Sequence, residues 1–372
     1  MNKTIIIGAG IVGTSTAYHL AKQGVEVTLV DADFDGRATT AAAGIVCPWV
    51  SQRRNQSWYY LARNSARFYP ELVDQLAAEG IENTGYKRVG TLVIRKDAKR
   101  FDKIHGVLQK RKDHAPEMGS VTQLSPEETK ARIPIIDDGY SSIEISGGAR
   151  VHGEKIRQAL LKACHKYGVK QIEGQAELIK ENGQAKAMVN DQVLQGNKII
   201  LAVGAWFSDL IKPLGMKGLI RPQKAQITEV QMKNKQTDDW PVIMPGGRSY
   251  MVPAENGSVV AGTTHEDNVG YDTSVTPGGL HQIFTDMLEL APDLANSSLS
   301  KVNVGFRPVA PHYLPVYGSL PEYENILVAN GLGSSGLTTG PYLGKELANL
   351  AVGKQAELDL ENYPVSSIVE KL

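Results

Sequence analysis

Thr4-Ile5-Ile6-Ile7-Gly8-Ala9-Gly10-Ile11-Val12-Gly13, near the start of the chain, is the stretch that decides the fold. Its first four residues predict a buried parallel strand that runs directly into a glycine turn. Residues 14–23 then carry apolar side chains at helical spacing, and residues 25–30 predict a second strand that ends at Asp31. The order of these elements predicts a βαβ unit.

The three glycines of this turn have separate physical roles. Gly8 allows the tight turn, Gly10 lets the backbone approach a pyrophosphate, and Gly13 permits close packing of helix on strand. The helix start offers free N–H groups and a positive dipole end to phosphate oxygens. The carboxylate of Asp31 can accept hydrogen bonds from adenosine ribose hydroxyls, and it disfavours NADP because it would repel a 2′-phosphate. The motif indicates a dinucleotide without separating FAD from NAD, and a glycine turn with no ligand is the alternative.

Composition limits the class of protein. A chain of 372 residues predicts two domains, and 42% hydrophobic with 22% charged residues is ordinary for a globular enzyme. Lys plus Arg and Asp plus Glu are both 40, so no basic surplus favours a nucleic-acid partner. The sequence shows neither a signal-peptide pattern nor an apolar run of about 18 residues that would span a membrane. Cys47 and Cys164 form no disulfide framework and no metal-ligand spacing, so a reducing, cytoplasmic setting is expected.

The remaining chain alternates between helical and strand patterns. Helices are predicted at residues 55–79, 98–112, 125–133, 154–167, 280–291 and 337–352. Strands are predicted at 89–94, 169–179, 199–203, 227–230, 250–252, 259–261 and 326–329, and 36–44 is expected to be a loop. Parallel-type strands lie at both ends and in the middle of the chain. This predicts a nucleotide domain built from discontinuous segments, with a β-rich domain inserted.

Three later segments carry a resemblance to a known family. They are Arg37-Ala38-Thr39-Thr40-Ala41-Ala42-Ala43-Gly44, then Ile200-Leu201-Ala202-Val203-Gly204-Ala205-Trp206, and Gly305-Phe306-Arg307-Pro308 followed by Asn330-Gly331-Leu332-Gly333-Ser334-Ser335-Gly336. With the first glycine turn, they resemble the D-amino-acid oxidase superfamily of FAD-dependent oxidoreductases, which includes glycine oxidase, sarcosine oxidase and D-amino-acid dehydrogenases. The likeness spans nearly the whole chain and is closest in layout to glycine oxidase.

The resemblance implies a fold class and a division of the chain. The fold is α/β with a β-rich part: a Rossmann-like FAD-binding domain from discontinuous segments, and an inserted substrate domain on an antiparallel sheet. Residues 1–85, 146–221 and 305–372 would form the FAD-binding domain. Residues 86–145 and 222–304 would form the substrate-binding domain.

The resemblance also implies a set of FAD contacts. The first glycine turn and Asp31 would hold the ADP half, the small-residue loop would lie by the pyrophosphate and flavin, and the C-terminal Gly-Ser segment would follow the pyrimidine edge of the flavin. A helix dipole there would stabilise the negative charge of the reduced flavin. The implied contacts are Gly8, Gly10, Ile11, Val12, Gly13, Asp31, Ala32, Arg37, Thr39, Thr40, Ala43, Gly44, Ile45, Ala176, Ala202, Gly204, Trp206, Arg307, Gly333, Ser334, Ser335, Gly336 and Leu337.

Two residues match substrate-binding positions of the family. Arg307 matches the arginine for the substrate carboxylate, a role that suits its planar, always-charged fork. Tyr250 matches a tyrosine that closes the pocket over the substrate. The alternatives are an interdomain ion pair for Arg307, at a turn stiffened by prolines, and simple strand packing for Tyr250.

The sequence departs from these relatives at several positions. Ser334 stands where glycine oxidase has a second arginine, and Val260 stands where sarcosine oxidase has a lysine. Neither Cys47 nor Cys164 falls at the cysteine that binds the flavin covalently in sarcosine oxidase, so the resemblance implies non-covalent FAD.

Other polar residues carry weaker signals. His265 could be a base near the substrate, but a solvated turn is the favoured interpretation. The pair Arg53-Arg54 could face the flavin or an acidic substrate, but a surface pair is favoured. His312 is given no role.

The expected reaction is oxidation of a small amine or amino acid, such as glycine, a D-amino acid, or an N-methyl or cyclic imino acid. Hydride would pass from the α-carbon to flavin N5, with O2 or another compound as final electron acceptor, and the imine product would hydrolyse. One charged hydrogen bond predicts that Arg307→Ala lowers catalytic efficiency about ten- to a hundred-fold. A dehydrogenase subunit that passes electrons to a quinone or partner flavoprotein, and a non-catalytic FAD-binding module, are the alternatives. Oligomeric state stays open.

Overall fold

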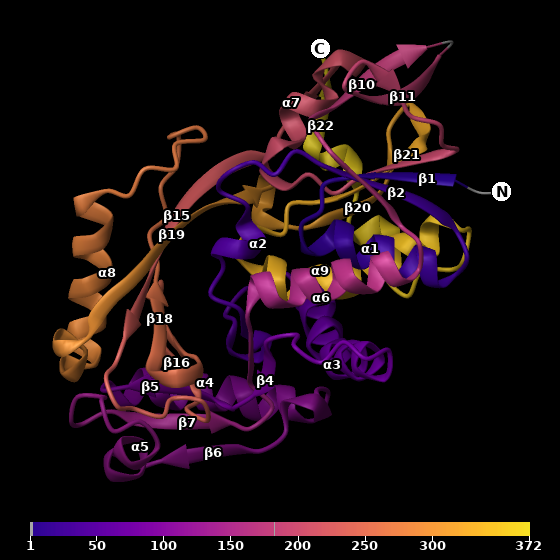
Figure 1. Cartoon of the computed structure of the whole chain (residues 1–372). Coiled ribbons are helices and arrows are strands. Elements are labelled where there is room, and N and C mark those ends of the chain that lie inside the picture. The colour runs from indigo at the N-terminus through magenta and orange to yellow at the C-terminus, as the bar shows by residue number, and fades with distance from the viewer. Residues whose placement is uncertain (1–2, 182) are drawn as a thin grey trace.

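The computed structural model describes residues 3–181 and 183–372, and two large sheets organise them (Figure 1). In the six-stranded sheet, β1 lies between β13 and β2, with β21 and β9 continuing the parallel pairing and β20 antiparallel at one edge. The strands in spatial order are β20 (Val316–Leu320), β21 (Tyr323–Asn330), β13 (Lys198–Leu201), β1 (Lys3–Ile7), β2 (Glu26–Asp31) and β9 (Lys170–Glu173). The N-terminal, middle and C-terminal parts of the chain therefore meet in one sheet.

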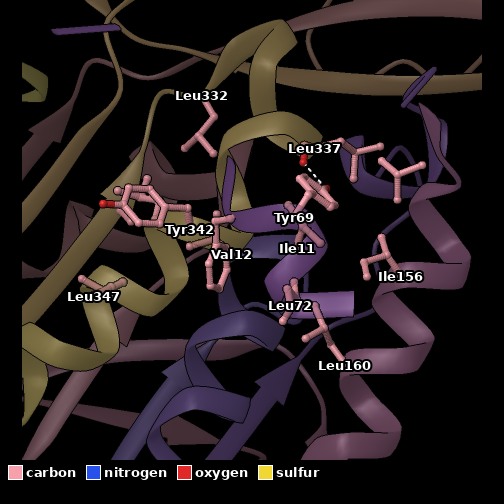
Figure 2. Close-up of a cluster of buried hydrophobic side chains, with 14 of the residues drawn as sticks. Ile11, Val12, Tyr69, Leu72, Ile156, Leu160, Leu332, Leu337, Tyr342 and Leu347 are labelled. Atoms are coloured by element: carbon pink, nitrogen blue, oxygen red, sulfur yellow. Dashed lines mark hydrogen bonds between the residues drawn. The ribbon is translucent and has the colours of Figure 1, made fainter. Parts of the chain in front are cut away.

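Side-chain alternation lets this sheet bury both of its faces. Ile6 packs among the helices on one face, whereas Ile5 and Ile7 pack on the opposite face. The helices on the first face are α1 (Ile11–Lys22), α3 (Gln56–Ala78), α6 (Gly153–Lys166) and α9 (Gly336–Ala351). Figure 2 shows the apolar side chains between these helices, where the Tyr69 hydroxyl donates a hydrogen bond to the Leu337 carbonyl oxygen. This bond ties the start of α9 to α3.

The opposite face of the six-stranded sheet is covered by α7 (Phe207–Ile211) and a small antiparallel sheet, whose residues share a second apolar cluster with it. That small sheet contains β10 (Ala176–Glu181), β11 (Gln184–Val189) and β12 (Gln192–Val193). Two further small sheets contain β3 (Ile45–Val46), β8 (Ala149–Val151) and β4 (Tyr86–Arg88), and β14 (Met216–Gly218) with β22 (Val369–Lys371).

The second large sheet has eight strands and is antiparallel except for the pair β5 and β16. This parallel pair joins two segments that are far apart in the sequence. In spatial order the strands are β19 (Ser298–Val309), β15 (Arg221–Gln231), β18 (Ser258–Gly262), β17 (Ser249–Pro253), β16 (Val242–Gly246), β5 (Thr91–Arg95), β7 (Ser141–Ile145) and β6 (Val121–Leu124). Figure 1 shows α8 (Pro277–Leu290) beside β15 and β18, and α8 also contacts β17. The remaining helices here are α4 (Ala98–Lys112) and α5 (Pro126–Arg132).

The predicted fold class is confirmed, with local corrections. The expected loop at 36–44 contains a one-turn helix, α2 (Ala38–Ala41). The expected strand at 169–179 is two strands of different sheets, because the chain breaks at Gly174, whose φ of +153° interrupts the pairing. The prediction of a turn around Arg307 is wrong: this segment lies in β19, where Arg307 is opposite Gln223 of β15.

The two-domain division stays a prediction. The eight-stranded sheet takes its strands from residues 91–145 and 221–309, so the predicted boundary at residue 305 falls inside β19. Within the described part of the chain, none of the helices combines the length and apolar character that crossing a membrane requires.

Candidate active site

A cavity of about 930 Å³ lies between the two large sheets. The ends of β1, β2 and β13 form one side, and β5, β15, β16, β17 and β19 form the other. Strand alternation decides which side chains face it: in β5, Val93 and Arg95 line the cavity, whereas Leu92 and Ile94 are in the core behind the sheet. The same alternation brings Ile227, Tyr250 and Arg307 to the cavity from three different strands.

The glycine turn after β1 forms one wall of the cavity. Its backbone packs so closely against neighbouring backbone that there is no room for side chains. Gly8 has φ +100°, and an added Cβ would lie 2.5 Å from the Ala202 carbonyl oxygen. At Gly13, an added Cβ would lie 1.8 Å from the Gly8 carbonyl oxygen. Gly13 is therefore a packing glycine that lies behind the cavity wall, which agrees with the role assigned to the third glycine of this motif.

The small-residue loop is hydrogen-bonded to this turn. The Thr39 hydroxyl oxygen accepts a hydrogen bond from the Ile11 backbone N–H at 3.0 Å, at the first residue of α1. Asp31 accepts from the Ala9 backbone N–H and forms an ion pair with Arg37. Thr40 donates to the Arg37 carbonyl oxygen and is not part of the cavity wall. Successive residues of a helical turn point about 100° apart, so only Thr39 of the pair faces inward.

Both ends of the chain contribute to one cavity, as the proposed FAD site requires. With the exceptions of Gly13 and Thr40, every residue predicted to contact FAD or substrate lines it. The C-terminal contribution is the 3₁₀ turn Gly333–Ser335 and the first residues of α9, whose N-terminus faces this side. The observed cradle, with a close-packed glycine backbone at one end and a helix start at the other, fits a dinucleotide that carries a flavin. The individual contacts remain predictions.

Arg307 is half-buried and is held by neutral groups. Its Nη1 donates to Gln223 Oε1 at 3.4 Å and to the Thr264 carbonyl oxygen at 3.2 Å, and its Nη2 donates to Thr263 Oγ1 at 3.0 Å. In the described parts of the chain, the arginines that form ion pairs are Arg37, Arg132, Arg157 and Arg221. The interdomain ion pair considered for Arg307 is therefore not formed with any described residue. Burial lowers its pKa from the ordinary arginine value, but a guanidinium stays charged.

Tyr250 lies over Gly262, close enough that an added Cβ at Gly262 would be 2.6 Å from the phenolic oxygen. Burial raises the pKa of Tyr250, although Arg307 and a hydrogen bond with Thr263 oppose the shift. The side chain is therefore a neutral phenol near Arg307. Gly262 is a position that the sequence analysis did not single out for packing, and only its long-range contact with Tyr250 reveals the role.

His265 lines the cavity, so the interpretation of this residue as part of a solvated turn is wrong. Burial, followed by the charges of Arg307 and Arg248, lowers the pKa of His265 to about 4. The imidazole is therefore neutral near pH 7. Its Nδ1 is buried and has no hydrogen-bond partner among residues 3–181 and 183–372.

Arg53 also lines the cavity, whereas Arg54 is exposed. The surface prediction for this pair is correct only for Arg54. The guanidinium of Arg53 lies 4.7 Å from the centre of the Trp58 ring, and its Nη2 donates to Ser334 Oγ at 3.4 Å. Sequence alone gave no signal for this contact. Ser334 is the position where the resemblance to glycine oxidase expects an arginine, and here an arginine reaches it from another segment.

The two cysteines differ in position. Cys47 lines the cavity, and burial raises its pKa to about 12, whereas Cys164 is buried among the helices. A thiol with so high a pKa is a poor nucleophile near neutral pH. The prediction of non-covalent FAD is consistent with this chemistry.

Comparisons with known proteins agree with the fold. The model of the family described as "FAD dependent oxidoreductase" matches residues 3–350. The chain is 48% identical to the uncharacterized oxidoreductase YurR of Bacillus subtilis (strain 168), over 98% of both chains. It is 27% identical to glycine oxidase of Pseudomonas aeruginosa, over 97% of this chain and 98% of that one.

Among solved structures, iminodiacetate oxidase from Chelativorans sp. BNC1 is 37% identical and has a TM-score of 0.95, covering 97% of this chain and 98% of the other. The predicted FAD cofactor and oxidoreductase class are confirmed by the match to the family. The chain is therefore a member of the FAD-dependent oxidoreductases of the D-amino-acid oxidase superfamily.

Proposed function

We propose that this protein oxidises a small amino or imino acid at the carbon between its nitrogen and its carboxylate. The observation that carries the proposal is the free edge of Arg307. A guanidinium has five N–H donors, and three of those in Arg307 are directed to neutral protein oxygens. With respect to residues 3–181 and 183–372, two donors remain for a ligand in the cavity, which matches the two oxygens of a carboxylate.

The neighbouring side chains suit an amine substrate. Tyr250 is a neutral phenol that can donate to the same carboxylate or close the site above it. His265 is neutral and lines the cavity, so its imidazole ring can accept a hydrogen bond from a substrate N–H. The positive charges of Arg307 and Arg248, which lower the pKa of His265, also disfavour an ammonium group here. The unprotonated amine has the lone pair that is needed to form the C=N bond when the α-carbon loses hydride.

Bound FAD supplies the two-electron acceptor, with N5 as the atom that takes the hydride. The protein positions the substrate and keeps charges in place, and no side-chain base at the α-carbon is required. The amine loses hydride from carbon and a proton from nitrogen, and water hydrolyses the resulting imine. The similar proteins glycine oxidase and iminodiacetate oxidase support an amine next to a carboxylate as the substrate class.

The test is anaerobic reduction of the purified, FAD-loaded protein, followed as loss of flavin absorbance. The panel is glycine, sarcosine, D-amino acids, D- and L-proline, hydroxyproline and iminodiacetate. We expect bleaching by at least one of them, and no bleaching by the matching carboxylic acids without nitrogen. If none of the amines reduces the flavin, the proposed chemistry is wrong. Oxygen uptake with and without an artificial dye then separates an oxidase from a dehydrogenase.

A further inference from the structure

The charges lining the cavity are unevenly compensated. Arg37 is paired with Asp31 and Asp33 beside β2. Four other arginines line the cavity and form no ion pair within the described ranges. They are Arg53, Arg95, Arg248 and Arg307. Cations held in partly buried positions without counter-ions favour an anionic ligand, because the ligand replaces lost hydration and reduces their mutual repulsion.

These four arginines are not equivalent. Arg307 binds the first carboxylate in the function proposed above. Arg95 is occupied by two backbone carbonyl oxygens, those of Ile94 and Met244, at 2.6 and 3.1 Å. Arg248 is exposed at the hairpin between β16 and β17. Arg53 is the remaining candidate: it is half-buried, and within the described residues its guanidinium forms one hydrogen bond, the bond to Ser334.

Arg53 is held in place by a built support. Its guanidinium stacks on Trp58, whose side chain is buried and whose Nε1 donates to Ser335 Oγ at 3.2 Å. Ser334 accepts from one end of the guanidinium, and stacking leaves the other N–H edges open. Burial lowers the pKa of Arg53, in the direction expected for a cation without a counter-ion. An ordered arginine edge of this kind loses little entropy when it binds an anion.

We infer that Arg53, supported by Trp58 and Ser334, is a second carboxylate subsite, so that the substrate is a secondary amine with a carboxylate on each arm. Arg307 binds the carboxylate next to the carbon that is oxidised, and Arg53 binds the carboxylate of the other arm. This inference rests on the proposed function for the role of Arg307. It adds the chemical class of the second substituent on nitrogen.

The test compares matched ligands that differ in one carboxylate. Oxydiacetate and methoxyacetate have an ether oxygen in place of nitrogen, so they bind without being oxidised, and their binding is read from the flavin difference spectrum of the FAD-loaded protein. Iminodiacetate and sarcosine are the corresponding amines, compared by kcat/KM. We expect the dicarboxylate of each pair to be favoured about ten- to a hundred-fold, the range of one charged hydrogen bond.

Two variants assign the preference to a residue. Arg53→Gln should bring each pair to within about threefold of equality, because only the second carboxylate loses its partner. Arg54→Gln removes the same charge from the exposed neighbour and should keep the wild-type preference. If Arg53→Gln does not fold with FAD, Arg53→Lys replaces it, and this variant should retain part of the preference because it keeps charge without the planar fork.

Several outcomes would overturn the inference. One is a wild type that does not distinguish the two members of either pair. A second is an Arg53→Gln variant that weakens both members equally. A third is an unchanged preference with an altered flavin reduction potential, which would assign Arg53 to the cofactor. If no amine reduces the flavin but oxydiacetate still binds more tightly than methoxyacetate, the subsite stands and the proposed amine chemistry fails. If sarcosine is oxidised without any preference for dicarboxylates, the proposed amine chemistry stands and the second carboxylate subsite fails.

Discussion

Replacing Arg307 by glutamine is the most direct test of the carboxylate clamp. Glutamine can still donate to neutral acceptors such as Thr263, so the packing of β19 on β15 should be kept. The change removes the charge and both donors that remain for the ligand. A charged hydrogen bond contributes about 1.5–3 kcal/mol, and 1.4 kcal/mol corresponds to about tenfold. Losing one such bond sets a minimum of about tenfold in kcat/KM, and losing two predicts about a hundred-fold or more.

The assay is rapid-mixing reduction of the flavin under anaerobic conditions, with the best amine from the panel as substrate. We expect Arg307→Gln to raise the substrate Kd and to slow flavin reduction, because the clamp both binds the substrate and orients its α-carbon. Arg307→Lys should recover part of the affinity, since it keeps the charge as a single point without the bidentate edge. FAD content and the flavin spectrum must match wild type in both variants.

The assignment would be refuted by a folded, FAD-saturated Arg307→Gln protein that keeps full efficiency on every amine that the wild type oxidises. Loss of FAD from Arg307→Gln would instead point to a role in holding the cavity together. In that case the Lys variant carries the test, because the long cation can still meet the acceptors from the adjacent strands.

Three further predictions concern other parts of the molecule. Tyr250→Phe should lower kcat/KM about two- to tenfold, the value of one neutral hydrogen bond, and Gly262→Ala should cost at least as much in the same assay because its Cβ displaces the Tyr250 ring. Acid denaturation should release all flavin into the supernatant, because burial raises the pKa of the Cys47 thiol and leaves it a poor nucleophile for the flavin; a yellow pellet would contradict this. Burial lowers the pKa of His19 to about 3. Below the ordinary histidine pKa of 6.5, the unfolded chain therefore binds more protons than the folded chain, and the folded state loses stability as the pH decreases. Between pH 7 and 5.5, the free energy of unfolding in urea should decrease by about 1.2 kcal/mol less in His19→Gln than in wild type. Equal decreases in the two proteins would argue against a buried, neutral His19.

The parts of the fold that were predicted correctly have short-range physical causes. The first βαβ unit follows from an apolar run, a glycine turn and a helical period within one continuous stretch, so no distant contact is needed to recognise it. Helix α5 shows the same point: the Ser125 side chain accepts from the Glu128 backbone N–H, and the Glu128 side chain accepts from the Ser125 backbone N–H. Such signals are readable because both partners lie within one turn.

The parts that were missed depend on distant partners. Strand β19 contains Gly305 and Pro308, residues that ordinarily indicate a turn, and it is a strand because its whole length pairs with β15. Arg53 belongs to the cavity through contacts with Trp58 and Ser334, and Ser334 lies at the other end of the chain. Gly262 and His265 are similar cases, since neither has a local pattern that distinguishes it from an ordinary strand end. Local pattern therefore located the cofactor cradle but not all of the substrate wall.

The fold holds Arg307 and Arg53 in different ways, which affects how substrate preference can change on this scaffold. Arg307 is fixed by Gln223, Thr263 and Thr264, all of them in or directly after strands that also build the sheet. Arg53 lies in the segment between β3 and α3 and is held by one stacking contact and one weak hydrogen bond. Replacing Arg53 should therefore cost little folding free energy, whereas a residue at position 307 that cannot form these hydrogen bonds would disturb a strand pair as well as ligand binding. The first carboxylate subsite is thus tied to the fold, while the second can be gained or lost by changing a residue that the fold does not need.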